Sequence, residues 1–136
     1  MPDSRNVPHI DMFRSPLGRA RGLGSARAGS KHWWAQRLTA VALVPLTIWF
    51  IWSMMRLTDA TQADVADWLS SPVRLALMLA LIAATFHHLQ LGLQVVIEDY
   101  VPQEGIRFAA VLAIKGLCVL LALICAISAL ILGLNP

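Results

Sequence analysis

The sequence predicts an all-α membrane protein with three transmembrane helices. Of its 136 residues, 57% are apolar and only 14% are charged, and the mean hydropathy is +0.64. A soluble domain of this size rarely carries so few charges, so we expect lipid to cover much of its surface. Three windows lack formal charge or nearly lack it, and each is about long enough to cross a ~30 Å hydrocarbon core with ~20 helical residues.

The three windows define the expected spans. They cover residues 38–55, 75–97 and 108–134, and Lys115 is the one charged residue inside them. With the flanking residues included, we expect helices over about 33–56, 73–98 and 106–133, within a three-helix anchor domain of residues 31–136.

The first 30 residues have a different composition. They are rich in Gly, Ser, Pro and Arg, as in GRARGLGSARAGS, and cannot bury enough apolar surface to fold alone. They also lack the apolar run of a secretory signal peptide, so we expect them to remain as a polar cytoplasmic tail.

The basic residues predict the topology. Two lie in the first loop, Arg56 and Arg74, whereas eight lie on the side of the N-terminus: Arg5, Arg14, Arg19, Arg21, Arg27, Lys31, Arg37 and Arg107. The positive-inside rule then places the N-terminus in the cytoplasm and the C-terminus in the periplasm, which makes this a multi-pass protein of a bacterial inner membrane. The net charge of +3 follows the loops rather than a soluble basic face, so no nucleic-acid partner is expected.

Proline and glycine mark the joints between the helices. Pro45 falls inside the first span, where we expect a kink. The loop LTDATQADVADWLSSP is polar, with Trp68 as an anchor in the outer interface and Pro72 near the first turn of the second helix. Pro102 and Gly105 are expected to turn the chain promptly into the third helix, so that helices two and three are antiparallel neighbours.

Two histidines lie at membrane depth, where ionisable residues usually mark a site. At ~100° per residue, His88, Gly92 and Asp99 share one stripe of the second helix, and His87 lies on the next. Gly92 leaves a flat space beside the His88 ring. Without a carboxylate or cysteine cluster, such an imidazole suits haem iron better than zinc. The second ligand would come from another chain, and the alternative is that both histidines only form interhelical hydrogen bonds.

The end of the second helix forms a second candidate site. Asp99 is roughly 16 Å from His88 along the axis, and Tyr100 follows it. A phenol and a carboxylate at a water boundary could donate a hydrogen bond to a quinone carbonyl and relay protons. The alternative is a solvated loop face. We expect Arg37 at the same membrane level, paired with Asp99, a haem propionate or a lipid phosphate.

Three further residues of the third span receive no catalytic role. Lys115 is expected to reach back to the cytoplasmic interface or to face a partner. Cys118 and Cys125 lie seven residues apart without a CxxC or haem-attachment motif, so we interpret both as small packing residues.

The stretch HHLQLGLQVVIEDY resembles the D-type membrane anchor subunits of succinate dehydrogenase, respiratory complex II. The pattern is His, three residues, Gly, six residues and Asp-Tyr, seen here as His88, Gly92, Asp99 and Tyr100. The block GSARAGSKHWWAQRLTAVALVPLTIWF is similar to the entry into the first helix of the same family, and the resemblance covers about residues 24–136.

The resemblance implies a subunit of an enzyme complex. In that family a flavoprotein oxidises succinate, an iron-sulfur protein carries the electrons, and two membrane chains bind haem b and ubiquinone between them. It implies that His88 is an axial haem ligand, paired with a histidine of the C-type anchor chain. Tyr100 would hydrogen-bond ubiquinone, Asp99 would support it and the proton path, and Arg37 would be a nearby polar partner.

Three alternatives remain open at this point. A one-residue rotation of the helix would present His87 to the iron in place of His88. The chain could instead anchor a quinol:fumarate reductase, which runs the electrons in the opposite direction. It could also be a non-redox structural or transport subunit, whose histidines only pack.

Overall fold

The computed structural model describes residues 27–135, and these form four helices. They are α2 (Arg27–Arg56), α3 (Gln62–Leu69), α4 (Pro72–Tyr100) and α5 (Glu104–Leu134). Within this range the chain has no strand. Most of the predicted tail of residues 1–30 lies outside the described residues, but α2 already begins at Arg27.

The three predicted spans are confirmed as long apolar helices. Ser30–Arg56, Pro72–Tyr100 and Glu104–Leu134 are each long and apolar enough to cross a membrane. With 27, 29 and 31 residues they extend about 40–46 Å at ~1.5 Å per residue, so their ends reach beyond a ~30 Å hydrocarbon core. The helices extend past the predicted bounds because polar end residues continue the helix into the interfacial layer.

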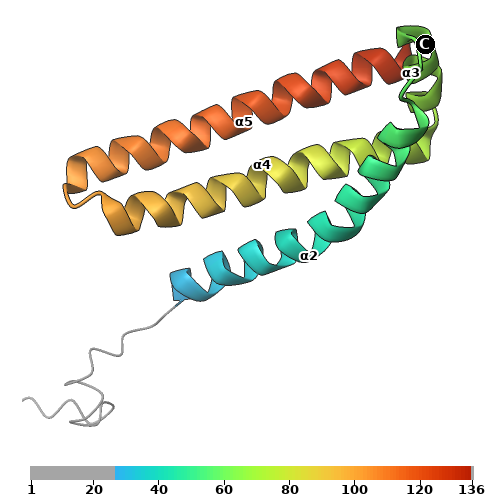
Figure 1. Ribbon diagram of the computed structural model, residues 1–136. Coiled ribbons are helices and arrows are strands. Elements are labelled where there is room, and N and C mark those ends of the chain that lie inside the picture. The colour runs from blue at the N-terminus through green and yellow to red at the C-terminus, as the bar shows by residue number, and fades with distance from the viewer. Residues whose placement is uncertain (1–26, 136) are drawn as a thin grey trace, which may run out of the picture.

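The three long helices lie in a row with α4 in the middle (Figure 1). The helix α4 packs against α2 on one side and α5 on the other, whereas α2 and α5 do not pack against each other within residues 27–135. Each helix runs antiparallel to its neighbour in the row. The start of α2, the end of α4 and the start of α5 therefore share one end of the molecule.

The helix α3 was not predicted, because the first loop was expected to be only a polar connection. Thr61 caps it: the Thr61 hydroxyl accepts from the Asp64 amide at 3.3 Å, and the Asp64 carboxylate accepts from the Thr61 amide at 2.8 Å. This capping box satisfies two amides at the helix start. Ala66 and Leu69 are buried, and α3 packs across the C-terminal end of α5.

The proline predictions agree with the structure, and one glycine prediction does not. Pro45 lies inside α2, which continues through it and bends in its second half (Figure 1). Pro72 is the first residue of α4. The second connection is only residues 101–103, including Pro102, and Gly105 is already part of α5. The turn therefore contains Pro102 but not Gly105.

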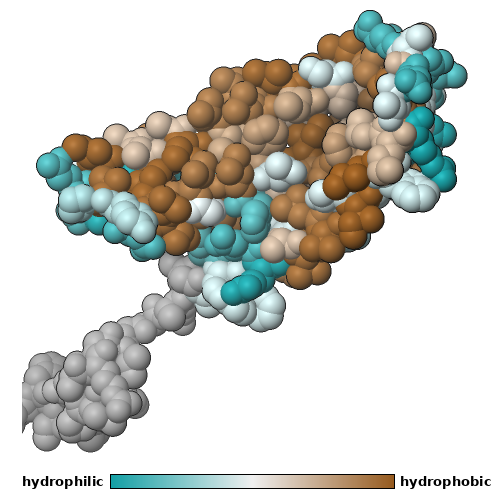
Figure 2. All heavy atoms as spheres, viewed as in Figure 1, coloured by the Kyte–Doolittle hydropathy of each residue, from teal (hydrophilic) through white to brown (hydrophobic). Residues whose placement is uncertain are grey.

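A single layer of helices buries few of its side chains. Four apolar residues are buried in the described part of the chain, Ala66, Leu69, Leu91 and Cys118, while many large apolar side chains are exposed. Figure 2 shows hydrophobic residues over most of the molecule and hydrophilic residues at its two ends, with a further hydrophilic area on the lower side of this view. This distribution suits a chain whose broad faces are covered by lipid and by partner helices.

The end of the row at which α3 lies is held by aromatic and cationic contacts. The rings of Trp49 and Trp68 stack with centroids 5.8 Å apart, and the Arg74 guanidinium lies 5.5 Å from the Trp68 ring centroid. Arg74 also donates to the Trp68 carbonyl oxygen at 2.6 Å. These contacts tie α3 to α2 and α4, at the end where Trp68 was expected to anchor the chain.

Candidate functional site

His88 on α4 faces α2 and is held there by Thr39. Its Nδ1 atom lies 3.0 Å from the Thr39 hydroxyl oxygen, and both side chains are half-buried. The same hydroxyl oxygen lies 2.9 Å from the Ala35 carbonyl oxygen and 3.0 Å from that of Gln36. The His88 ring is therefore fixed to α2 through one nitrogen. The structure gives Nε2 no hydrogen-bond partner among the residues it describes.

His88 and Arg37 line the same hollow. This hollow, of about 290 Å³, lies between α2 and α4 and is lined by Trp33, Gln36, Arg37, Ala40 and His88. The Arg37 guanidinium lies 5.4 Å from the Trp33 ring centroid, so its side chain reaches back toward the start of α2. The hollow thus combines an imidazole, a cation and an amide between two helices that are mostly apolar.

The sequence predicted that Arg37 lies level with Asp99 and Tyr100. This prediction is wrong for the position of the Arg37 backbone. Because α2 begins at Arg27, Arg37 is ten residues inside the helix, about 15 Å from its start. The neighbouring Thr39 bonds to His88, so this part of α2 lies at the level of the histidine. Among the described residues, Arg37 forms no ion pair with Asp99. The structure brings Arg37 to His88 instead.

Gly92 lies one turn from His88 on the same side of α4. A Cβ added there would meet only the Gln36 Nε2 atom of this chain, at 3.8 Å, within a 4 Å radius. No other side chain of the described chain fills the space beside Gly92. The chain is therefore open around the Gly92 Cα within that radius, which is compatible with the flat space expected beside His88.

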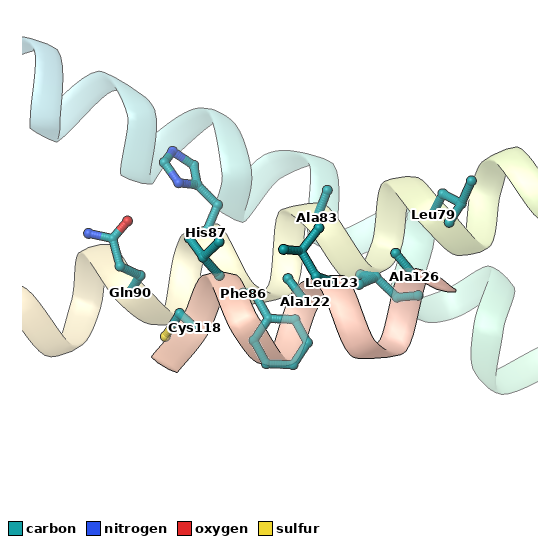
Figure 3. Close-up of a pocket in the computed structure, with 11 residues that line it drawn as sticks. Leu79, Ala83, Phe86, His87, Gln90, Cys118, Ala122, Leu123 and Ala126 are labelled. Atoms are coloured by element: carbon teal, nitrogen blue, oxygen red, sulfur yellow. The ribbon is translucent and has the colours of Figure 1, made fainter. Parts of the chain in front are cut away.

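His87 lies in a different environment. It is exposed and contributes to a second hollow of about 340 Å³, between α4 and α5. Figure 3 shows His87 and Gln90 near one end of this hollow and Leu79 and Ala126 toward the other. Apart from these two polar residues and Cys118, its lining is aliphatic or aromatic. His88 lines the hollow toward α2 and His87 lines the hollow toward α5. The two adjacent histidines therefore lie on different faces of α4.

A ladder of polar side chains continues from Gln90 to the end of α4. Gln90 donates to Gln94 at 3.3 Å, and Gln94 donates to the Glu98 carboxylate at 2.7 Å. Each bond links residues four apart, which are neighbours on a helix surface. Glu98 is therefore held along the helix, whereas Asp99 and Tyr100 project freely from its end.

Asp99 and Tyr100 are both exposed at the last turn of α4. The exposed fraction of Tyr100 is 81%, and within residues 27–135 neither side chain forms a hydrogen bond or ion pair. Their donor and acceptor atoms remain open to a bound molecule. By rise alone, they lie roughly 16 Å from His88 along the helix axis.

The sequence analysis identified neither Trp33 and Gln36, which line the His88 hollow, nor Thr39, which bonds to His88. Trp33 lies in the basic and aromatic entry of the first span, a composition typical of a membrane interface. A signal for the other two exists, because Gln36 and Thr39 are polar residues three apart at the entry of a span, and polar groups in a span usually face protein.

The three residues singled out in the third span differ in their exposure. Lys115 is exposed on α5, Cys118 is buried against α4, and Cys125 is exposed. The packing interpretation therefore holds within this chain for Cys118 alone. In the described part of the chain, no three His, Cys, Asp or Glu side chains come together as a metal-binding group. His88 is thus a single nitrogen donor, and a second axial ligand would have to come from outside this part of the chain.

Comparison with known proteins adds independent information. Residues 12–122 match the family model described as "Succinate dehydrogenase/Fumarate reductase transmembrane subunit". A succinate dehydrogenase hydrophobic membrane anchor subunit of Rickettsia bellii is 34% identical over 104 residues, covering 76% of this chain and 82% of the relative. The subunit of the same name from Paracoccus denitrificans is 31% identical over 123 residues, covering 89% of this chain and 95% of the relative.

No solved structure matches this chain. The family match nevertheless spans α2, α3, α4 and more than half of α5, and it includes both the His88 hollow and the Asp99–Tyr100 end of α4. With two relatives above 30% identity that cover 76% and 89% of this chain, the chain belongs to the succinate dehydrogenase/fumarate reductase transmembrane subunit family.

Proposed function

We propose that this chain is a membrane anchor subunit of a succinate:ubiquinone oxidoreductase, and that it helps to bind haem b and ubiquinone. The observation that carries the proposal is the hollow in which His88 and Arg37 meet. The choice of enzyme complex is supported by the relatives that are named as succinate dehydrogenase anchor subunits. The chain itself is a multi-pass inner-membrane protein, and succinate is oxidised on a partner chain.

The residues around His88 fit a haem. An imidazole held through Nδ1 can present Nε2 to iron, and the Arg37 guanidinium can pair with a propionate carboxylate. Gly92 leaves room for a flat ring system beside the histidine. When bound, haem b supplies reversible one-electron transfer at membrane depth. His88 would provide one axial ligand, and a histidine of the C-type anchor chain would provide the other.

The end of α4 fits a quinone head group. The Tyr100 hydroxyl can donate a hydrogen bond to a quinone carbonyl oxygen, and the Asp99 carboxylate can hold or pass on a proton. Reduction of a quinone to a quinol consumes two electrons and two protons, so the site needs contact with water. The exposure of both side chains at the helix end satisfies that need.

The topology orders the partners. If the basic N-terminal side is cytoplasmic, the end of α4 faces the cytoplasm, where Asp99 and Tyr100 would meet the iron-sulfur subunit and, beyond it, the flavoprotein subunit. Electrons would then reach the quinone site before the haem. The C-terminus of α5 and the helix α3 would face the periplasm.

Purification of the tagged chain in mild detergent tests the proposal. We expect flavoprotein and iron-sulfur subunits to co-purify and a reduced-minus-oxidised spectrum of b-type haem. His88→Leu should abolish the low-spin haem signal, whereas the adjacent His87→Leu, on the other face of α4, is the matched control and should retain it. A complex without haem would contradict the proposal, and loss of haem in His87→Leu alone would move the ligand to His87.

A further inference from the structure

The Thr39 hydroxyl is placed to orient the His88 ring. Its oxygen lies within 3.0 Å of three groups: His88 Nδ1 and the carbonyl oxygens of Ala35 and Gln36. A hydroxyl carries one proton but can accept hydrogen bonds through two lone pairs. The single proton cannot be donated to all three groups, and only His88 Nδ1 among them can itself be a donor.

The two carbonyl oxygens decide where the Thr39 proton goes. A carbonyl oxygen can only accept, and threonine in a helix commonly donates to the carbonyl three or four residues earlier. The distances of 2.9 and 3.0 Å to Ala35 and Gln36 match this bond. With its proton engaged there, the Thr39 oxygen has only lone pairs to offer to His88.

We propose that Thr39 is a positioning residue that accepts a hydrogen bond from His88 Nδ1–H and thereby fixes the imidazole tautomer whose Nε2 lone pair is free to bind iron. This inference rests on the proposed function, since it concerns the ligation of haem by His88. The structure gives His88 no other hydrogen-bond partner within residues 27–135, so this one contact sets both the tautomer and the ring orientation.

The low polarity of the membrane makes the contact consequential. A buried N–H group without an acceptor is costly, so the Nδ1 proton favours the ring rotation that reaches Thr39. An acceptor on the far nitrogen also makes imidazole a more basic ligand, and such partners of metal-bound histidines typically matter 10–100-fold in affinity. A more basic ligand stabilises ferric over ferrous iron and lowers the midpoint potential of the haem.

Substitution of Thr39 in the intact complex tests the inference. Thr39→Val keeps the side-chain volume but removes the acceptor, whereas Thr39→Ser keeps the hydroxyl. We expect Thr39→Val to lower haem retention, to raise the haem midpoint potential and to shift the low-spin g-values. Thr39→Ser should restore all three. If Thr39→Val does not assemble, Thr39→Ala removes the same acceptor without adding branched methyl groups.

Ser53 provides a matched control on the same helix. Its hydroxyl donates to the Trp49 carbonyl oxygen at 2.8 Å, which is the same backbone contact as in Thr39, but it touches no histidine. Ser53→Ala should leave the g-values and the potential unchanged. Unchanged g-values and potential in Thr39→Val or Thr39→Ala, in a complex where His88→Leu removes haem, would overturn the role of Thr39. Retention of haem in His88→Leu would instead overturn the proposed ligand itself.

Discussion

Leu69 of α3 lies directly against the backbone of Gly133 in α5. A Cβ built on Gly133 would be 3.1 Å from the Leu69 carbonyl oxygen and 3.3 Å from the Leu69 Cγ atom. Gly133 and Leu69 are both buried, and they form the point at which the short helix α3 meets the C-terminal end of α5.

Gly133→Ala should therefore loosen the contact between α3 and α5. The added methyl group is too close to a backbone oxygen, and overpacking of this kind costs about 1–3 kcal/mol. A lower thermal midpoint of the purified complex in mild detergent would show it. Gly105→Ala and Gly116→Ala are controls on the same helix, because nothing of this chain lies within 4 Å of the Cβ at either position. A midpoint unchanged from wild type in Gly133→Ala would contradict the close approach.

Substitutions of Gly92 should separate the fold from the haem. Ala fits, since its Cβ would meet only Gln36 Nε2 at an ordinary 3.8 Å, so Gly92→Ala should accumulate and retain haem. Gly92→Leu should also accumulate but should lose haem, because the larger side chain would enter the space one turn from His88. Reduced-minus-oxidised absorbance per complex measures the difference. Full haem content in Gly92→Leu would mean that the haem does not use this face of α4.

Loss of the Tyr100 hydroxyl should slow quinone reduction without slowing succinate oxidation. For Tyr100→Phe we expect a fall in kcat/KM for ubiquinone of about 5–30-fold, the value of one hydrogen bond of 1–2 kcal/mol. Electron transfer from succinate to a soluble artificial acceptor should be unchanged. Asp99→Asn should impair the same step, because it removes the carboxylate that holds a proton.

Glu98→Gln is the control for both variants, since Glu98 is exposed beside Asp99 but is engaged along the helix by Gln94. We expect it to retain wild-type ubiquinone kinetics. If Glu98→Gln were impaired and Asp99→Asn were not, the polar ladder rather than the end of α4 would carry the protons.

The cap of α3 should weaken in acid. Hydrogen bonds donated by the Thr61 hydroxyl and the Thr61 amide hold the pKa of Asp64 below its ordinary value of 3.8. Because the folded-state pKa is the lower one, the cap contributes fully above pH ~4 and is lost as the pH falls through the folded-state pKa. A ¹³C titration of the Asp64 carboxyl should give a midpoint below 3.8 in wild type and a higher one in Thr61→Val. Equal midpoints would contradict the cap.

The spans could be predicted because the thickness of a membrane and the rise of a helix leave little choice of length. The start of the first helix could not, since polar residues such as Arg27 continue that helix beyond its apolar window. Because the helix begins earlier than predicted, Arg37 lies at the level of His88 and not at its start. A window marks where the chain is apolar, whereas the end of a helix depends on local backbone bonding.

The sorting of the two histidines was partly predictable. The spacing to Gly92 favoured His88, and the structure places His88 toward α2 and His87 toward the groove with α5. The partner of His88 could not be predicted, because Thr39 is 49 residues away in the chain and only packing brings it near. The helix α3 was hidden by its polar composition, although Thr61 and Asp64 have the spacing of a capping box.

The position of α4 in the middle of the row has a consequence for how the protein is made. Every residue that lines the His88 hollow precedes Val101 in the chain, and α5 does not pack against α2 in the described structure. The hollow therefore needs nothing from about the last quarter of the polypeptide. A ribosome that has inserted α2 and α4 has already delivered this chain's whole share of the hollow, before α5 has entered the membrane.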